Sequence, residues 1–141
     1  MFKPNTKFLV VDDSSTTRKL IRNSLAELGF ENVVEAADGV EAFQVLEGLA
    51  QSPAPIDFII SDWNMPNMQG IDFLKKCRAQ DEFKNTPFLL ITVEGEPGQI
   101  LEAGNAGVTE YLVKPYNSEV FKMKIENIYR KINNLPLLSR K

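Results

Sequence analysis

The chain has 141 residues, of which 43% are hydrophobic and 25% charged, and its 16 basic and 19 acidic side chains give a net charge of −3. This composition is typical of one globular domain with a hydrophobic core, and the weak negative charge argues against partners such as nucleic acid or an anionic membrane surface. The single cysteine, Cys77, excludes an internal disulfide, and the lack of histidine excludes imidazole-based zinc sites, catalytic triads and histidine general bases. No segment resembles a signal peptide or is apolar enough to cross a bilayer, so we expect a cytoplasmic protein.

The first part of the chain predicts a strand, a helix and a second strand. Residues 8–13 form a short apolar run that is typical of a buried strand. A helix should follow, with Ser14 or Ser15 as its N-cap and Gly29 as its end. The apolar residues of this helix recur at helical spacing: Leu20, Ile21, Leu25 and Leu28. Residues 32–36 predict the second strand.

The middle of the chain repeats this alternation of helix and strand. A second helix is indicated by Val40, Phe43, Leu46 and Leu49. After a turn or short loop at 51–55, residues 58–62 predict the third strand. A third helix is indicated by Ile71, Leu74 and Cys77. Residues 87–92 predict the fourth strand.

The last third of the chain contains one weak helix and one strong helix. Pro97 suits the first turn of a helix within 94–107, but four glycines weaken that helix by about 1 kcal/mol each, so we expect it to be short or mobile. Residues 110–115 predict the fifth strand. Asn117 should cap the final helix and Pro136 should follow its end. The apolar face of that helix consists of Phe121, Ile125, Ile128 and Ile132.

Five strands that alternate with five helices predict an α/β fold with right-handed crossovers and a parallel sheet covered on both faces. We expect one domain over 1–141, with a core at about 7–133 and no effector domain.

Five polar side chains are expected where the strands of this sheet end: Asp12, Asp13, Asp62, Thr92 and Lys114. Sites in open parallel sheets form beyond the carboxyl ends of the strands. If the first and third strands are neighbours, three carboxylates meet and repel one another unless a cation is present. A site that offers only oxygen ligands favours a hard ion, above all Mg²⁺.

The same constellation suits phosphoryl chemistry. The ammonium group of Lys114 and the hydroxyl group of Thr92 are suited to binding phosphoryl oxygens. Asp62 is then placed to attack phosphorus and form an acyl phosphate. Taken singly, an aspartate after a strand more often caps a helix, as Asp12 or Asp13 could, although Ser14 and Ser15 are available for that role.

Four segments of the sequence resemble one known family: "FLVVDDSSTTRKLIRN", "SDWNMPNMQG", "LLIT" and "EYLVKP". They are similar to the receiver domains of two-component response regulators, and most of all to the single-domain chemotaxis regulators of the CheY type. The resemblance runs from about Lys7 to the end of the last helix. It implies a flavodoxin-like, doubly wound sheet with strand order 2-1-3-4-5.

The resemblance also implies roles for individual residues. Asp62 would be the phosphoacceptor, receiving a phosphoryl group from the histidine of a sensor kinase. The metal site for Mg²⁺ would consist of Asp12, Asp13, Asp62 and the backbone carbonyl of Asn64, with Asp12 acting partly through water. Thr92 and Lys114 would contact the phosphoryl oxygens. Tyr111 would be the switch aromatic whose ring turns inward on phosphorylation, although its residue type alone indicates only a half-buried strand tyrosine.

The implied partners are a chemotaxis-type histidine kinase and a target that binds the phosphorylated form, such as the flagellar motor switch protein, with a phosphatase as a further candidate. The output face would comprise the fourth helix, the fifth strand and the fifth helix of a monomer. Two departures from the family pattern stand out. Val93 replaces the usual alanine or glycine and should slow phosphotransfer or dephosphorylation, and the glycine-rich 94–107 segment weakens the output face.

Other functions remain open at this level. A phosphorelay intermediate or a phosphate sink would use the same site. A phosphohydrolase of the haloacid dehalogenase type needs an aspartate two residues after the nucleophile, where this chain has Asn64. A flavodoxin needs a phosphate loop rich in hydroxyl and amide groups after the first strand, where this chain has "DDSS".

Overall fold

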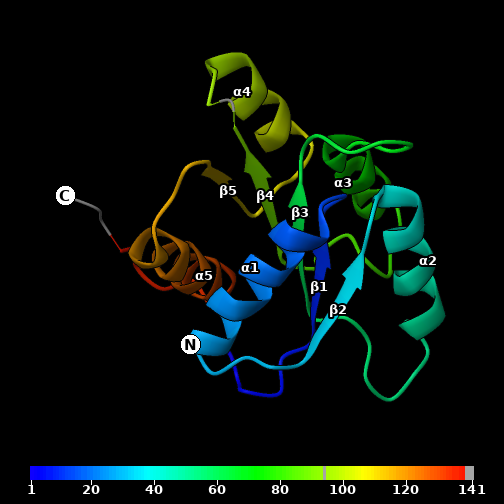
Figure 1. Cartoon of the computed structure of the whole chain (residues 1–141), viewed down its shortest axis with the longest axis horizontal. Helices are drawn as coiled ribbons and strands as arrows, with labels where there is room; N and C mark the ends of the chain where they lie inside the picture. Colours follow the sequence, from blue (N-terminus) through cyan, green and yellow to red (C-terminus); the bar gives the residue numbers. More distant parts are fainter. Residues whose placement is uncertain (94, 139–141) are drawn as a thin grey trace.

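A computed structural model describes residues 1–93 and 95–138, in which five strands alternate with five helices (Figure 1). The strands are β1 (Phe8–Val11), β2 (Val33–Ala36), β3 (Phe58–Asp62), β4 (Phe88–Thr92) and β5 (Glu110–Val113). The helices are α1 (Ser15–Glu27), α2 (Gly39–Leu49), α3 (Gly70–Arg78), α4 (Pro97–Asn105) and α5 (Ser118–Ile132). Glu94, which the sequence placed at the start of the fourth helical segment, lies outside the described residues.

All strands are parallel and follow the order β2-β1-β3-β4-β5, which confirms the expected topology. In the register of the sheet Val11 pairs with Ser61, and Thr92 pairs with Val113. The residues that follow β1 and β3 therefore leave the sheet side by side at the same edge. The carboxyl ends of β4 and β5 lie next along this edge.

Helices cover both faces of the sheet, as expected, because successive strand residues point to opposite sides (Figure 1). On one face, Leu9, Ile59 and Leu90 belong to a cluster with the buried residues of α2 and α3. The other face carries Val10, Ile60, Leu89 and Leu112, which pack with the buried residues of α1 and α5. The two clusters together form the hydrophobic core.

The helix ends follow the local chemistry of the sequence. Ser14 caps α1 by accepting a hydrogen bond from the Thr17 N–H, and Asn117 caps α5 in the same way through the Val120 N–H, so both predicted caps are confirmed. Gly29 follows α1 with φ +91°, a left-handed conformation that glycine adopts without steric cost.

Three predicted core positions are wrong: Leu20, Val40 and Ile132 are 60%, 43% and 47% exposed. Each lies in its helix but outside the stripe that meets the sheet. The apolar runs at 8–13 and 110–115 also overestimate two strands, which end at Val11 and Val113. The Asp12 N–H still donates to Ala36 O and the Lys114 N–H to Thr92 O, so the polar side chains begin where the regular ladder stops.

Helix α4 has nine residues with Pro97 in its first turn, and Ala103 is its one buried residue, which confirms the expectation of a short helix. After α5 the chain reverses at Asn134, whose φ is +56°, and returns along the helix. Asn127 then donates to Leu138 O and accepts from the Leu138 N–H. None of the helices in the described part of the chain has the length and apolar character needed to cross a membrane.

Candidate functional site

Three carboxylates converge at the carboxyl ends of β1 and β3. Asp12 and Asp13 directly follow β1, and Asp62 ends β3. Since these strands are neighbours, one carboxylate oxygen from each aspartate lies within 4.8 Å of the other two. Asp12 is buried, Asp62 is half-buried and Asp13 is exposed, so the cluster opens to solvent on the side of Asp13.

Backbone and side-chain donors hold Asp12 in place. Its Oδ1 accepts a hydrogen bond of 2.8 Å from the Ser14 N–H, so the turn into α1 orients the carboxylate. Its backbone carbonyl accepts a 2.6 Å hydrogen bond from the guanidinium of Arg18, which is also paired with Glu35 at 2.8 Å. Arg18 was not among the predicted site residues, although its position one turn into a helix that follows two aspartates was a usable signal.

Lys114 brings a positive charge to this cluster from the end of β5. Its ammonium nitrogen lies 3.2 Å from Oδ1 of Asp62 and 3.9 Å from Oδ2 of Asp12. Burial raises the pKa of Asp62, and the charge and hydrogen bond of Lys114 oppose that rise without cancelling it. Burial also raises the pKa of Asp12, to which the negative charge of Asp62 adds. One lysine therefore does not fully compensate the three carboxylates.

The donor set fits a hard divalent cation. The converging ligands are carboxylate oxygens, which Mg²⁺ prefers, and a cation would offset both the burial of Asp12 and Asp62, which raises their pKa values, and the repulsion between the carboxylates. Asn64, the expected source of a carbonyl ligand, is exposed two residues after Asp62. Two backbone hydrogen bonds, both 2.8 Å long, fix the neighbouring Trp63. Its N–H donates to Ile91 O, and its carbonyl accepts from the Gly70 N–H.

Gly70 is a second supporting residue that was not among the predicted site residues. A Cβ atom at this position would lie 2.0 Å from the backbone oxygen of Asp62, far inside van der Waals contact. That oxygen also accepts a hydrogen bond from the Ser61 hydroxyl at 2.9 Å. The start of α3 thus packs directly against the peptide of Asp62, and only glycine permits this approach. The "QG" before an apolar helix was the available signal.

Thr92 is the last residue of β4, and Lys114 directly follows the neighbouring strand β5. The Lys114 N–H donates a 2.7 Å hydrogen bond to Thr92 O, so the two residues leave the sheet together. Thr92 is buried, whereas the adjacent Val93 is exposed. Val93, Leu20 and Lys114 line an open groove of about 880 Å³ between α1 and the segment after β5.

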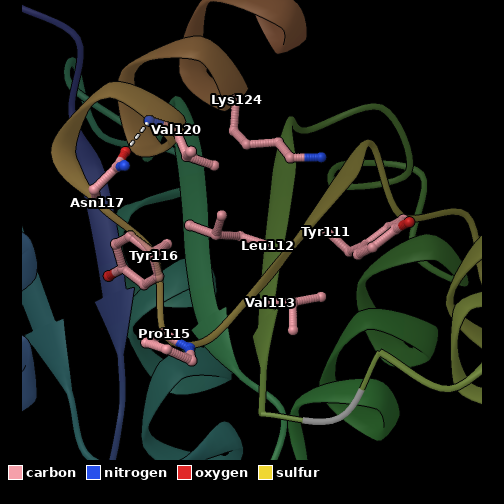
Figure 2. Close-up of a pocket in the computed structure, with 8 residues that line it drawn as sticks. All are labelled: Tyr111, Leu112, Val113, Pro115, Tyr116, Asn117, Val120 and Lys124. Carbon is pink, nitrogen blue, oxygen red and sulfur yellow. Dashed lines mark hydrogen bonds between the residues drawn. The ribbon is translucent and has the colours of Figure 1, made fainter. Parts of the chain in front are cut away.

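Tyr111 lies on the same face of the sheet as Thr92. Tyr111 pairs with Leu90, which precedes Thr92 by two residues and packs with the α3 side of the core. Figure 2 shows the tyrosine side chain on the opposite side of β5 from Leu112, directed away from Tyr116 and Asn117. The ammonium nitrogen of Lys124 lies 4.9 Å from the centre of the ring, over its face. Tyr111, Tyr116, Asn117 and Lys124 line a cleft of about 340 Å³ between β5 and the start of α5.

The site brings together most of the residues that the sequence singled out. Asp12, Asp13, Asp62 and Lys114 meet in one cluster, and Thr92 lies at the end of the adjacent strand. Tyr111 and Lys124 lie farther out, at the edge of the sheet. The contact between Tyr111 and Lys124 joins a strand to a helix that follows it in sequence, and the residue types alone did not indicate it.

Comparisons with known proteins agree with this geometry. Residues 8–126 match the family described as "Response regulator receiver domain". The chain is 46% identical over 127 residues to the chemotaxis protein CheY of Pseudomonas aeruginosa, which covers 90% of this chain and 98% of that protein. It is 45% identical over 128 residues to CheY-3 of Vibrio cholerae, covering 91% of this chain and 95% of that protein.

Solved structures show the same likeness. The chemotaxis response regulator CheY4 of Vibrio cholerae superposes with a TM-score of 0.76 at 40% identity, over 88% of this chain and 98% of that one. A response regulator receiver domain protein from Clostridium thermocellum gives a TM-score of 0.78 at 27% identity, over 92% of this chain and 98% of that one. The match over most of the chain, together with the sheet order, shows that this protein belongs to the response regulator receiver domain family of two-component signalling.

Proposed function

We propose that this protein is a chemotaxis response regulator that accepts a phosphoryl group on Asp62 from the phosphohistidine of a sensor kinase. The observation that carries the proposal is the position of the Asp62 carboxylate, 3.2 Å from Lys114 and within 4.8 Å of Asp12 and Asp13 at one edge of the sheet. The names of the relatives, which are chemotaxis proteins of the CheY type, support the chemotaxis assignment.

In the proposed reaction an oxygen of the ionised Asp62 carboxylate attacks the phosphorus atom of the donor. A P–O bond to Asp62 forms as the P–N bond to the donor histidine breaks, and the leaving imidazole nitrogen keeps the bonding electron pair and takes up a proton. Lys114 and the Thr92 hydroxyl would bind the phosphoryl oxygens, because an ammonium and a hydroxyl are donors at the ends of the two adjacent strands. In this proposal the protein catalyses only its own phosphorylation and dephosphorylation at Asp62.

Asp12, Asp13 and Asp62, with the backbone carbonyl of Asn64, would hold Mg²⁺. When bound, the ion would supply positive charge against the phosphoryl oxygens and against the three carboxylates. The chain's own contribution is to hold the ligands in position. The Ser14 N–H orients Asp12, and the close contact of Gly70 with the Asp62 peptide positions Asp62.

The signal would leave the site through Thr92 and Tyr111. Movement of Thr92 toward the phosphoryl group would open space into which the ring of Tyr111 turns, which changes the surface formed by α4, β5 and α5. The position of both residues on the same face of the sheet supports this coupling. We propose the flagellar motor switch as the target of that surface, in a cytoplasmic monomer, with a phosphatase as a further partner.

Incubation with acetyl phosphate, with and without Mg²⁺, tests the central step. Intact mass measurement should show one added phosphoryl group in the presence of Mg²⁺, and none for Asp62→Asn. Asp57→Asn is the matched control, because Asp57 precedes the same strand and accepts a backbone hydrogen bond far from the carboxylate cluster. Labelling that persists in Asp62→Asn would refute the assignment of the phosphoacceptor.

A second experiment separates the motor from the phosphorelay. Binding of the phosphorylated protein to a motor-switch peptide should be stronger than binding of the unmodified protein. Transfer of the label from Asp62 to a histidine phosphotransferase, without such binding, would instead identify a relay intermediate or a phosphate sink.

A further inference from the structure

We propose that Lys124, held by Glu110, is a positioning residue that keeps the ring of Tyr111 at the outer edge of β5 and so favours the resting state of the switch. This inference rests on the proposed function, in which the ring turns toward Thr92. It adds two residues to that function, Glu110 on β5 and Lys124 on α5, which together set how readily the ring turns.

Tyr111 and the helix that carries Lys124 lie on opposite faces of the sheet. Tyr111 points to the face that carries Leu90 and Thr92, whereas its neighbour Leu112 points to the opposite face and packs with α5. Lys124 belongs to α5 and reaches around the exposed edge strand to the ring (Figure 2). The ammonium group therefore contacts the ring at the edge of the sheet, on the side away from β4.

An ion pair fixes the ammonium group at this edge. Lys124 Nζ lies 3.2 Å from Oε1 of Glu110, and the two side chains are only 21% and 15% exposed. The same glutamate oxygen accepts a hydrogen bond from the Tyr111 N–H at 3.1 Å. Glu110 thus connects the backbone of the tyrosine to the cation that covers its ring, and the partial burial of the pair makes this arrangement more persistent than a solvated ion pair.

A cation over an aromatic face stabilises the position of the ring. When the ring turns inward along its own face of the sheet toward Thr92, it moves away from the edge where Lys124 is held by Glu110. The contact is then lost in the turned state and kept in the resting state. A contact present in only one of two states shifts the equilibrium toward that state.

Lys124 is not needed to attach α5 to the sheet. Phe121, Ile125 and Ile128 pack into the core on the same helix, and Lys131 Nζ donates a 2.7 Å hydrogen bond to Thr109 O just before β5. These contacts remain when Lys124 is replaced. The effect of a substitution on the ring can therefore be separated from an effect on the packing of the helix.

The test uses the full chain labelled with 3-fluorotyrosine and observed by ¹⁹F NMR, with the three tyrosine signals assigned by Tyr→Phe substitution. Mg²⁺ and beryllium fluoride, which mimics a phosphoryl group, define the signal of the turned ring in the wild type. In Lys124→Met without these additions, we expect the Tyr111 signal to move toward that position, corresponding to a three- to tenfold larger turned population. The initial rate of labelling by acetyl phosphate should rise in parallel.

Three variants complete the design. Lys124→Arg preserves both the ion pair and the cation over the ring and should behave like the wild type. Glu110→Gln should shift the signal in the same direction as Lys124→Met but by less. Lys122→Met, an exposed lysine on the same helix, should change neither the signal nor the rate.

The outcomes distinguish this inference from the function on which it rests. If the wild-type Tyr111 signal responds to Mg²⁺ and beryllium fluoride but Lys124→Met matches the wild type in both signal and labelling rate, the role of Lys124 is refuted and the switch stands. If the wild-type signal does not respond at all, the switch itself is refuted and the role of Lys124 with it.

Discussion

The ammonium nitrogen of Lys114 lies 3.2 Å from the carboxylate of Asp62, although 52 residues separate them in the sequence. Two properties of the parallel sheet produce this contact. The strands β3, β4 and β5 are consecutive neighbours, and their carboxyl ends lie at one edge. The lysine offsets part of the cost of burying the Asp62 carboxylate, and the remaining cost leads to the first prediction.

Replacing Asp62 by asparagine should stabilise the metal-free protein at pH 7. Burial raises the pKa of Asp62, so the folded chain holds its proton more tightly than the unfolded chain does, and ionisation at neutral pH costs stability. Removing the charge should raise the free energy of unfolding by about 1 kcal/mol, measured by urea denaturation in EDTA. Asp81→Asn, at a nearly fully exposed position, should have no measurable effect. A destabilised Asp62→Asn protein would show that the pairing with Lys114 outweighs the cost of burying the charge.

In the presence of Mg²⁺, the wild type should become more stable than Asp62→Asn. An ion that binds only the folded wild-type cluster stabilises it by mass action, whereas a variant with one carboxylate fewer binds the ion more weakly. Trp63 is buried and directly follows Asp62 in the chain, so its fluorescence should report binding when the protein is titrated with Mg²⁺. The same titration of Asp62→Asn should require a much higher concentration of Mg²⁺, and equal affinities would contradict the ligand assignment.

Gly70→Ala should destabilise the protein severely. The added Cβ would lie 2.0 Å from the Asp62 backbone oxygen and 3.1 Å from a methyl carbon of Leu90, so either α3 or the end of β3 must shift. We expect a loss of about 3 kcal/mol or more in the free energy of unfolding, together with slower labelling by acetyl phosphate.

Gly48→Ala is the matched control for this substitution. Gly48 is also in a helix, and a Cβ there meets no atom of the described residues within 4 Å. Alanine is the better helix former by about 1 kcal/mol, so this variant should be slightly more stable than the wild type. Similar losses for both variants would mean that the contact at Asp62 is not the cause.

The buried thiol of Cys77 should make stability fall in alkaline solution. Burial raises the pKa of this thiol from its ordinary value of 9.0 to about 12. Between these values the unfolded chain releases the proton and the folded chain keeps it, so the free energy of unfolding falls as the pH rises. The contribution of Cys77 is up to about 1.4 kcal/mol per pH unit.

Urea denaturation at pH 8 to 11 measures this effect as a difference between the wild type and Cys77→Ala. The variant should be less stable at pH 8 because a cavity replaces the sulfur, and the gap should narrow at higher pH. In addition, a thiol reagent should modify the native wild-type protein far more slowly than the denatured one. A gap that stays constant with pH would contradict the raised pKa.

Val93→Ala should accelerate the chemistry at Asp62. Val93 is exposed beside Thr92 and lines the same groove as Lys114, so its branched side chain lies on the approach to the cluster. We expect faster phosphotransfer or faster dephosphorylation, by about two- to tenfold, measured by the decay and the build-up of the labelled protein. Leu20→Ala, on the α1 wall of the same groove, is the control for a general change in the groove. Unchanged rates in Val93→Ala would remove any role for this residue.

Much of this structure is local enough to be predicted from the sequence. The β-branched apolar runs indicated the five strands, and Ser14 and Asn117 were identified as caps because capping depends on residues within one turn. The positions that failed, such as Leu20 and Ile132, are apolar residues at the margin of a helical stripe. Periodicity places such a residue near a face but cannot tell how wide the contact with the sheet is.

The candidate site divides in the same way. Asp12, Asp13, Asp62, Thr92 and Lys114 could be found from the sequence because a parallel sheet brings the ends of all its strands to one edge. The roles of Arg18, Gly70 and Lys124 depend on the packing of a helix against a strand, so the sequence offered only a weak local signal for Arg18 and Gly70 and none for the contact of Lys124 with Tyr111.

By itself, then, the sequence of this protein determined the alternation of elements and the residue types at the strand ends, because these follow from short-range preferences and from polarity. Only the tertiary structure decided how close the carboxylates lie, which of them are buried, and which cation covers the ring of Tyr111. Burial and the distance to Lys114 set the pKa of Asp62, and both arise only when segments far apart in the chain pack together.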